Sequence, residues 1–240
     1  MDLKQYIDYI GTWLQEQVKL ANAKGVIVGL SGGIDSALVA SIAQKAFPNN
    51  HQTVWMDCES SKFDYECAHE LINFKKFHNV DVDLTSTYKD LISELDSKIK
   101  LSDLSKANAK ARLRMTTLYA IGQTKNYLVL GTDNADEWHI GYFTKFGDGG
   151  VDLLPIVHLL KGEVKDAARL MEVCDSIINR APSAGLWDNQ TDEEEIGVSY
   201  DEIDDYLSGK KISEKSKQRI DYLHKISNHK RVGAPAPSKK

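Results

Sequence analysis

Short apolar runs alternate with longer amphipathic stretches along the first half of the chain. The run at 26–30 is almost wholly apolar, and shorter candidates follow at 53–56, 80–84 and 127–130. A short run with few polar residues is typical of a strand that is buried on both faces of a parallel sheet. The pattern therefore predicts a sheet of parallel strands.

Helical periodicity fills the intervals between these runs. On 3–23 the apolar residues recur on one helical face, and further helices are predicted at 37–46, 64–77 and 105–123. Alternation of strands and helices is typical of the α/β class. We expect a doubly wound parallel sheet with helices on both faces.

The pattern changes after residue 141. The segment 143–150 is rich in Gly and reads as an ordered loop, and 161–173 reads as a helix. Ser199 and Glu202 have capping-box spacing, and Ser213 can cap a last helix. We expect a single domain over 1–232, completed by C-terminal helices, and a loose tail over 233–240.

Composition narrows the possible partners and surroundings. The 240 residues carry a net charge of −5, so neither nucleic acid nor a membrane surface is an expected partner. No apolar run approaches the roughly 18 residues that a membrane span needs. Three cysteines make an odd number, which argues against a disulfide framework. A reducing cytoplasm is the expected location.

The first candidate site is the segment Gly29-Leu-Ser-Gly-Gly-Ile-Asp-Ser36, between the most apolar run and a predicted helix. Glycines let the backbone amides turn toward one point at a helix N-terminus, where an anion is favoured. Ser31 and Ser36 add hydroxyl donors, so the segment suits a phosphate. The alternative is an ordinary Gly-rich turn with Asp35 and Ser36 as helix caps.

This segment is not a Walker A loop, because it lacks the Lys of that motif. Asp35 alone would repel a phosphate. A divalent cation between the two would resolve that conflict, and Mg²⁺ is the expected metal.

A second candidate site, Thr132-Asp-Asn-Ala-Asp-Glu137, follows the run at 127–130. Ligands of open parallel sheets bind beyond the carboxyl ends of the strands. We therefore expect this segment and the phosphate loop to face one cleft, with Glu137 as a second oxygen ligand for the metal. Capping of a helix by Thr132 and Asp133 is the alternative.

Together the motifs resemble two nested families. The S-G-G-x-D-S sequence is the signature of ATP pyrophosphatases, which cleave ATP between its α and β phosphates. More specifically, the chain is similar to ammonia-dependent NAD synthetases. The segments that carry this second resemblance are Lys110-Ala-Arg-Leu-Arg-Met115, Gly131–Glu137, Gly141-Tyr-Phe-Thr-Lys-Phe-Gly-Asp-Gly-Gly150, Asp152-Leu-Leu-Pro155, Gly197–Leu207 and His229-Lys-Arg231.

The resemblance implies a role for each matching position. Asp35 and Glu137 match the magnesium ligands. The positions that match the ATP site are Gly29, Leu30, Ser31, Gly32, Gly33, Ile34, Asp35, Ser36, Thr132, Lys161 and Ser183. The positions that match the site of deamido-NAD, the acid form of the cofactor, are Arg112, Tyr119, Lys145, Asp152, His229 and Lys230. Taken singly, each of these residues has a structural alternative, such as a solvated helix face for Arg112.

One region departs from the family. After the second strand the family has Arg-Leu-Pro-Tyr-Gly followed by Gln, whereas this chain has Met56-Asp-Cys-Glu-Ser-Ser-Lys-Phe63. The family's Arg contact to the adenosine part of ATP is missing. Lys62 is the candidate replacement.

The resemblance implies a ligase that forms a C–N bond in NAD biosynthesis. ATP adenylates the nicotinate carboxylate of deamido-NAD, and ammonia displaces AMP. Asp148 is a candidate for handling ammonia, with Asp35 and Lys161 as the other catalytic candidates.

The family also implies a homodimer, for which Leu113, Leu118 and Ile121 are candidate contacts. The rival hypotheses are another ATP pyrophosphatase, which amidates or thiolates a nucleotide or tRNA, and a nucleotide-binding module without catalysis.

Overall fold

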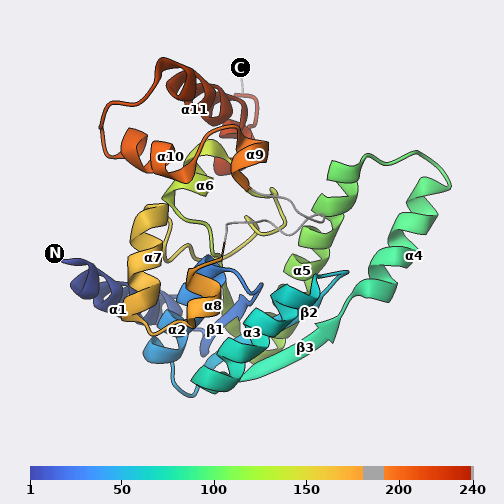
Figure 1. The fold of residues 1–240 in the computed structure, drawn as a ribbon. Helices are drawn as coiled ribbons and strands as arrows, with labels where there is room; N and C mark the ends of the chain where they lie inside the picture. The colour runs from blue at the N-terminus through green and yellow to red at the C-terminus, as the bar shows by residue number, and fades with distance from the viewer. Residues whose placement is uncertain (181–191, 239–240) are drawn as a thin grey trace.

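A four-stranded parallel sheet forms the centre of the molecule (Figure 1). The computed structural model describes residues 1–180 and 192–238. The strands β1 (Gly25–Gly29), β2 (His51–Asp57), β3 (Asn79–Asp83) and β4 (Tyr127–Leu130) lie in the order β3-β2-β1-β4. The chain thus runs outward from β1 to one edge and returns to the other side of β1. The expected doubly wound sheet is confirmed.

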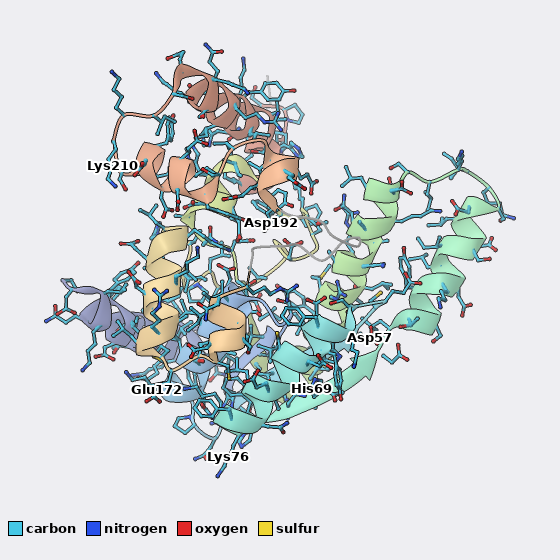
Figure 2. The ribbon with its side chains drawn as sticks, in the orientation of Figure 1. Asp57, His69, Lys76, Glu172, Asp192 and Lys210 are labelled. Carbon is cyan, nitrogen blue, oxygen red and sulfur yellow. The ribbon has the colours of Figure 1, made fainter. Side chains whose placement is uncertain are left out.

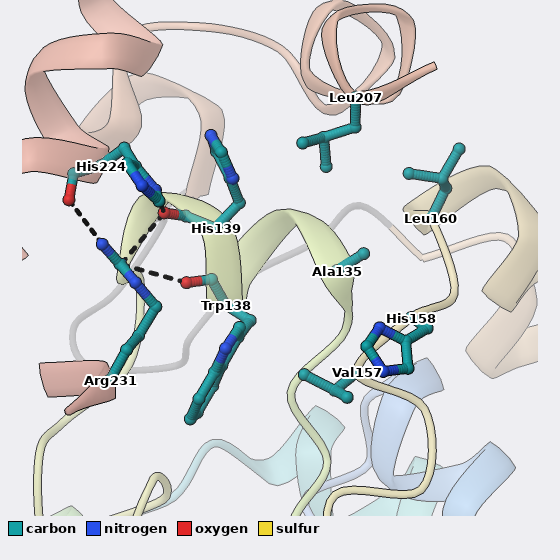
Figure 3. A pocket seen from close by; sticks show the side chains of 9 residues that line it. All are labelled: Ala135, Trp138, His139, Val157, His158, Leu160, Leu207, His224 and Arg231. Carbon is teal, nitrogen blue, oxygen red and sulfur yellow. Dashed lines mark hydrogen bonds between the residues drawn. The ribbon is translucent and has the colours of Figure 1, made fainter. Parts of the chain in front are cut away.

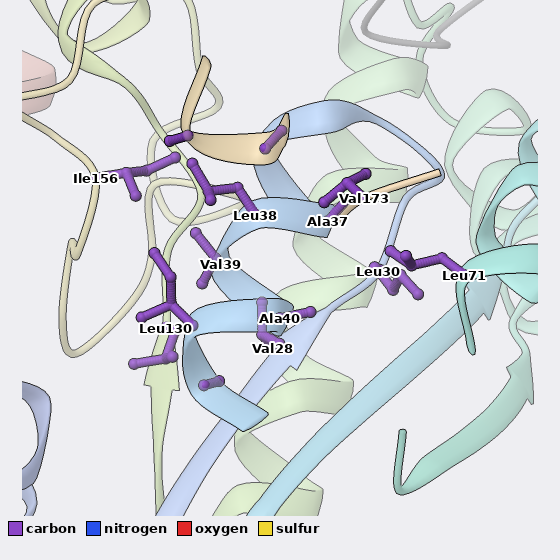
Figure 4. Packing of buried hydrophobic residues seen from close by; sticks show 14 of the residues in the cluster. Val28, Leu30, Ala37, Leu38, Val39, Ala40, Leu71, Leu130, Ile156 and Val173 are labelled. Atoms are coloured by element: carbon purple, nitrogen blue, oxygen red, sulfur yellow. The ribbon is translucent and has the colours of Figure 1, made fainter. Parts of the chain in front are cut away.

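Helices cover both faces of this sheet. One face packs against α1 (Leu3–Leu20), α2 (Ile34–Ala46), α3 (Lys62–Lys75) and α7 (Lys161–Leu170), in the largest hydrophobic core. Figure 4 shows its centre, where Leu38 and Val39 of α2 lie among side chains of the strands. The other face packs against α4 (Thr85–Asp96) and α5 (Asp103–Lys125), in a second core.

A layer of short C-terminal helices lies above the carboxyl ends of the strands (Figure 1). It has its own core, centred on Ile140, Ile203 and Ile220, each at most 3% exposed. This layer closes the space over the phosphate loop from above. Its helices are α6 (Ala135–Ile140), α9 (Asp192–Ile196), α10 (Tyr200–Leu207), α11 (Glu214–Ile226) and α12 (Asn228–Arg231), and α8 (Asp175–Ile178) connects α7 to the layer.

Two differences from the expected elements have clear causes. The helix α4 was not predicted, because its sequence is largely polar and Tyr88 is its only buried residue. The first helix ends at Leu20, short of the expected 23, because Asn22 adopts a left-handed φ of 51° that turns the chain into β1. The capping roles of Ser199 and Ser213 are confirmed. The boundary between domain and tail at residue 232 stays a prediction.

Candidate active site

The two candidate segments meet at the point where the strand order reverses. β1 and β4 are neighbours in the sheet, although β2 and β3 come between them in the sequence. Such a reversal leaves a crevice in which open α/β sheets bind their ligands. The expectation that both segments face one cleft is confirmed by a cavity of about 500 Å³ that both line.

Internal hydrogen bonds fix the shape of the phosphate loop. The Ser31 amide donates to Ser36 Oγ at 3.1 Å, and Ser36 Oγ donates to the Gly33 carbonyl at 3.0 Å. Gly32 has a φ of +81°, and a Cβ there would lie 2.5 Å from the Asp64 carbonyl oxygen. Only glycine fits this position. The loop ends at the N-terminus of α2, whose dipole favours an anion.

A lysine joins the two predicted metal ligands. Lys161 Nζ lies 2.7 Å from an Asp35 oxygen and 3.0 Å from a Glu137 oxygen. The lysine side chain is 3% exposed. Burial opposes its charge, but the two carboxylates outweigh that effect and raise its pKa. Asn134 holds Asp35 from the other side, with Nδ2 to Oδ1 at 2.8 Å.

The carboxylates at this centre fit a magnesium ion. Asp35 and Glu137 converge on one cationic nitrogen, so the geometry already accommodates positive charge between them. Carboxylate oxygens beside a phosphate loop are the ligand type that Mg²⁺ prefers. Burial raises the pKa of Glu137 to about 7, while Lys161 opposes the rise, so the charge on Glu137 depends on a nearby cation.

A second pair of acids, Asp133 and Asp148, lines the same cavity. Asp133 is 4% exposed, and within the described part of the chain its Oδ2 has no hydrogen-bond partner. Burial and the neighbouring Asp148 raise its pKa. Asp148 lines the cavity and remains exposed to it, and partial desolvation by the surrounding protein groups raises its pKa too. Lys230, from α12, faces both acids and donates to the carbonyls of Gly141 and Phe143 at 2.7 Å.

Most of the predicted site residues either line the cavity or lie outside its wall, and Gly32 and Ser183 are special cases. Gly32 shapes the phosphate loop from behind, and Ser183 lies outside the described residues. The predicted residues in the wall are Gly29, Leu30, Ser31, Gly33, Ile34, Asp35, Ser36, Thr132, Glu137, Asp148, Lys161 and Lys230. The predicted residues that do not line it are Arg112, Tyr119, Lys145, Asp152 and His229.

The predicted residues that lie outside the wall form two separate sets of contacts. Arg112 donates to the Lys145 carbonyl at 3.2 Å, and Lys145 Nζ bonds the His229 carbonyl. The Tyr119 hydroxyl donates to Asp152 at 3.0 Å, and the other Asp152 oxygen accepts the Val129 amide at 2.8 Å. Asp152 therefore fastens its own segment to β4 and to α5. Binding of deamido-NAD by this group stays a prediction.

The proposed replacement for the family's arginine is wrong. The Lys62 side chain is 89% exposed and pairs with Glu66 away from the cavity. The cavity wall instead contains Arg114 and Arg180, neither of which was predicted. Arg114 donates to the Met56 carbonyl and to Ser60 Oγ, both at 3.2 Å. Its place in the segment 110–115, beside Arg112, was the available signal.

Arg180 was harder to find, because it lies in no motif. It forms an ion pair with Asp64 at 2.5 Å and donates weakly to the Gly32 carbonyl at 3.4 Å. Asp64 is the residue whose backbone requires glycine at position 32. The ion pair therefore ties the start of α3 to the phosphate loop.

The C-terminal layer adds a network of tyrosines and acids. Asp192 lies where this layer meets the sheet layer (Figure 2). Its two carboxylate oxygens accept the hydroxyls of Tyr142 and Tyr200, both at 3.1 Å. Tyr200 also reaches Glu137, at 3.2 Å. This network links the layer to the lysine-centred cluster.

Another carboxyl pair lies behind that cluster. Asp136 is fully buried on α6, and its pKa is raised to about 9 by burial and by contact with Asp204 of α10. Asp204 also accepts hydrogen bonds from the N-terminus of α7.

A shallower pocket on the other side of α6 is lined by His139, His224 and Arg231 (Figure 3). Arg231 donates to the carbonyls of Trp138 and His139, at 3.2 and 3.0 Å, and to the carbonyl of His224. These carbonyls belong to the last turns of α6 and α11, which have no helical partners for them. Arg231 therefore fastens the C-terminal layer, whereas the adjacent Lys230 faces the active cleft.

The fold and the site define a class: a doubly wound α/β protein with a nucleotide phosphate loop and a carboxylate pair suited to magnesium. The pattern of the NAD synthase family matches residues 6–234. The chain therefore belongs to the NAD synthase family.

Individual relatives agree with this assignment. The NH(3)-dependent NAD(+) synthetase of Mesoplasma florum is 59% identical, over 99% of this chain and 98% of the relative. The enzyme of the same name from Mycoplasmopsis pulmonis is 50% identical, over 98% and 91%. Among solved structures, an NMN synthetase from Francisella tularensis matches with a TM-score of 0.95 and 41% identity, over 100% of both chains. An NH3-dependent NAD synthetase from Campylobacter jejuni matches with a TM-score of 0.83 and 26% identity, over 99% and 100%.

Among residues 1–180 and 192–238, no helix has the length and apolar character that crossing a membrane requires.

Proposed function

We infer that this chain is a ligase that converts deamido-NAD, ATP and ammonia into NAD, AMP and pyrophosphate. The observation that carries this proposal is the lysine-centred carboxylate cluster beside the phosphate loop, in a chain 59% identical to a named NH(3)-dependent NAD(+) synthetase. The cluster suits ATP activation of an acid.

The reaction has two balanced steps. A nicotinate carboxylate oxygen attacks the α-phosphorus of ATP, the bond to the bridging oxygen breaks, and pyrophosphate leaves. The nitrogen lone pair of ammonia then attacks the carboxyl carbon of the adenylate, and AMP leaves with the bridging oxygen and the bonding electrons. Ammonia loses a proton to form the amide. None of these steps requires a Ser or Cys nucleophile.

The chain's own residues divide this work between two ends of the cleft. The loop amides and Ser31 and Ser36 hold phosphate oxygens, and Lys161 offers positive charge where pyrophosphate departs. Asp35 and Glu137 would hold magnesium, which when bound neutralises phosphate charge. At the other end, Asp148 and Lys230 face the space left for the second step.

A donor comparison tests the activity. With ATP, Mg²⁺ and deamido-NAD, we expect NAD from ammonium and only background NAD from ammonia-free glutamine. NAD formed at equal rates from both donors would contradict ammonia as the direct donor. ATP binding without turnover of any acid would support the non-catalytic alternative, and turnover of a different nucleotide acid or tRNA would support another ATP pyrophosphatase.

A second candidate substrate is the mononucleotide acid, nicotinate mononucleotide. The observation that favours it is the TM-score of 0.95 to an NMN synthetase, against 0.83 to an NAD synthetase. The donor assay with both acids at equal concentration separates them. A higher kcat/KM for the mononucleotide acid than for deamido-NAD would identify the mononucleotide as the preferred substrate.

We further propose a homodimer, although not through the predicted contacts. Leu118 is 8% exposed, and Leu113 and Ile121 pack on the second core, so these residues serve the chain's own fold. Two exposed apolar residues lie together at the free end of the α4–α5 hairpin, where Ile99 is 64% and Leu104 is 55% exposed, and we propose this end as the contact.

Light scattering at micromolar concentration should therefore give the mass of two chains, and the double change Ile99→Lys with Leu104→Lys should give one. The matched control is Leu20→Lys on α1, which is 79% exposed but distant from the hairpin, and which should stay dimeric. A fully active monomeric wild type would contradict the proposal.

We also propose a cytoplasmic location, consistent with the free thiols of Cys58, Cys67 and Cys174.

A further inference from the structure

We propose that Asp204 of α10 is a positioning residue that fixes Lys161 for the adenylation step. Its two carboxylate oxygens accept the first two backbone amides of α7, from Lys161 and Gly162, both at 2.9 Å. Asp204 lies about forty residues further along the chain, in the C-terminal layer. The catalytic part of this inference rests on the proposed function.

The N-terminus of α7 depends on this distant carboxylate. The first amides of any helix have no partners within the helix and are normally capped by the preceding side chain. Here the preceding residue is Leu160, whose side chain cannot accept a hydrogen bond. Asp204 supplies the missing acceptors, and its negative charge suits the positive end of the helix dipole.

Gly162 is an independent sign that this contact is close. A Cβ at this position would lie 2.8 Å from the Asp204 carboxylate, within the distance at which one of the two must move. Glycine is otherwise a poor choice inside a helix, where alanine is preferred. The glycine therefore leaves room for the carboxylate.

The contact acts on Lys161 from its backbone end. The lysine side chain is 3% exposed, and its nitrogen must meet Asp35 at 2.7 Å and Glu137 at 3.0 Å together. A tilt of the first turn of α7 would shift that nitrogen relative to both carboxylates. Asp204 prevents the tilt, so the packing of α10 on α7 places the cation that faces the departing pyrophosphate.

The test is a double-mutant cycle of Asp204→Ala and Gly162→Ala. Each change should reduce the pyrophosphate burst rate by about 10- to 100-fold, because a displacement near 1 Å has an effect of that order. The KM for ATP should change far less, since the phosphate loop is untouched. The double variant should be no slower than the slower single variant, because both changes break the same contact. Asp204→Asn, which keeps one acceptor oxygen, should recover part of the rate.

The matched control is Asp205→Asn, which alters the next residue of α10, a partly exposed acid paired with Lys210 at 2.8 Å. It should leave the burst rate unchanged. Multiplying effects in the double variant, or a normal burst rate in folded Asp204→Ala, would overturn the proposal. So would a Gly162→Ala variant that is more stable than the wild type and keeps its burst rate, which is the result that helix preference alone predicts.

A readout without turnover separates this inference from the proposed function. Hydrogen exchange at the amides of Lys161 and Gly162 should accelerate in Asp204→Ala and stay slow in Asp205→Asn. If the wild type makes no NAD, the proposed function fails while the exchange result still stands or falls by itself. Unchanged exchange at both amides would overturn the positioning role, whatever the substrate.

Discussion

Asp35→Asn and Glu137→Gln should each slow pyrophosphate release by about 10²–10³-fold, the usual effect of removing a group that stabilises charge in the transition state. Both carboxylates bind Lys161, and both are the proposed magnesium ligands. Either change leaves the lysine with a single carboxylate and weakens the hold on the metal. The amide side chains keep nearly the same shape, so the fold should persist.

The measurement is the rate of pyrophosphate release during a magnesium titration, with circular dichroism as the check on folding. Asp166→Asn is the matched control, because Asp166 is an exposed acid on α7, five residues beyond Lys161, that pairs with Arg169. Its rate and magnesium dependence should equal those of the wild type. If Asp35→Asn or Glu137→Gln kept the wild-type rate and the wild-type magnesium dependence, Asp35 and Glu137 would not share a metal.

Asp148→Asn should separate the two half-reactions. Ammonium has no lone pair, so a group near the adenylate must bind the cation, accept a proton and release ammonia for attack. Asp148 lines the cavity near Asp133 and Lys230, and partial desolvation by the surrounding groups raises its pKa. Oδ1 also accepts the Thr144 amide at 3.0 Å, as a simple turn residue would. The asparagine variant should release pyrophosphate in a normal burst and then form NAD slowly.

Rapid-quench analysis of pyrophosphate and NAD in the same samples measures both steps. The adenylate should accumulate in the Asp148→Asn variant and remain low in the wild type. The control is Glu94→Gln, which should behave as the wild type. Glu94 is an exposed acid on α4 that pairs with Lys98. Equal losses in both steps would make Asp148 a structural or ATP-site residue.

Local features were predictable from the sequence. The phosphate loop follows from eight consecutive residues, because glycines and a following helix determine its backbone. The order of the strands brings Glu137 to the same crevice, since the carboxyl ends of neighbouring parallel strands share one edge. The family resemblance added Lys161, which no local rule would have placed between two acids.

Features that depend on packing between distant segments were not predictable. Arg180 reaches Asp64 across more than a hundred residues, and Asp204 caps a helix to which it is not adjacent. No periodicity or spacing records such contacts. Lys62 failed as a replacement for a related reason, because the helix α3 turns that side chain outward. The long helix likewise turns Leu118 inward, against the sheet.

Lys230 lines the cleft and binds the carbonyls of Gly141 and Phe143, which precede it in the sequence by almost ninety residues. During synthesis, the phosphate loop and the lysine-centred cluster emerge well before α12 does. A ribosome-bound chain that has exposed α10, with Asp204, but not α12 holds most of the ATP site, and it lacks the cation at the other end of the cleft. Nascent chains should therefore bind nucleotide before they are able to complete an amidation.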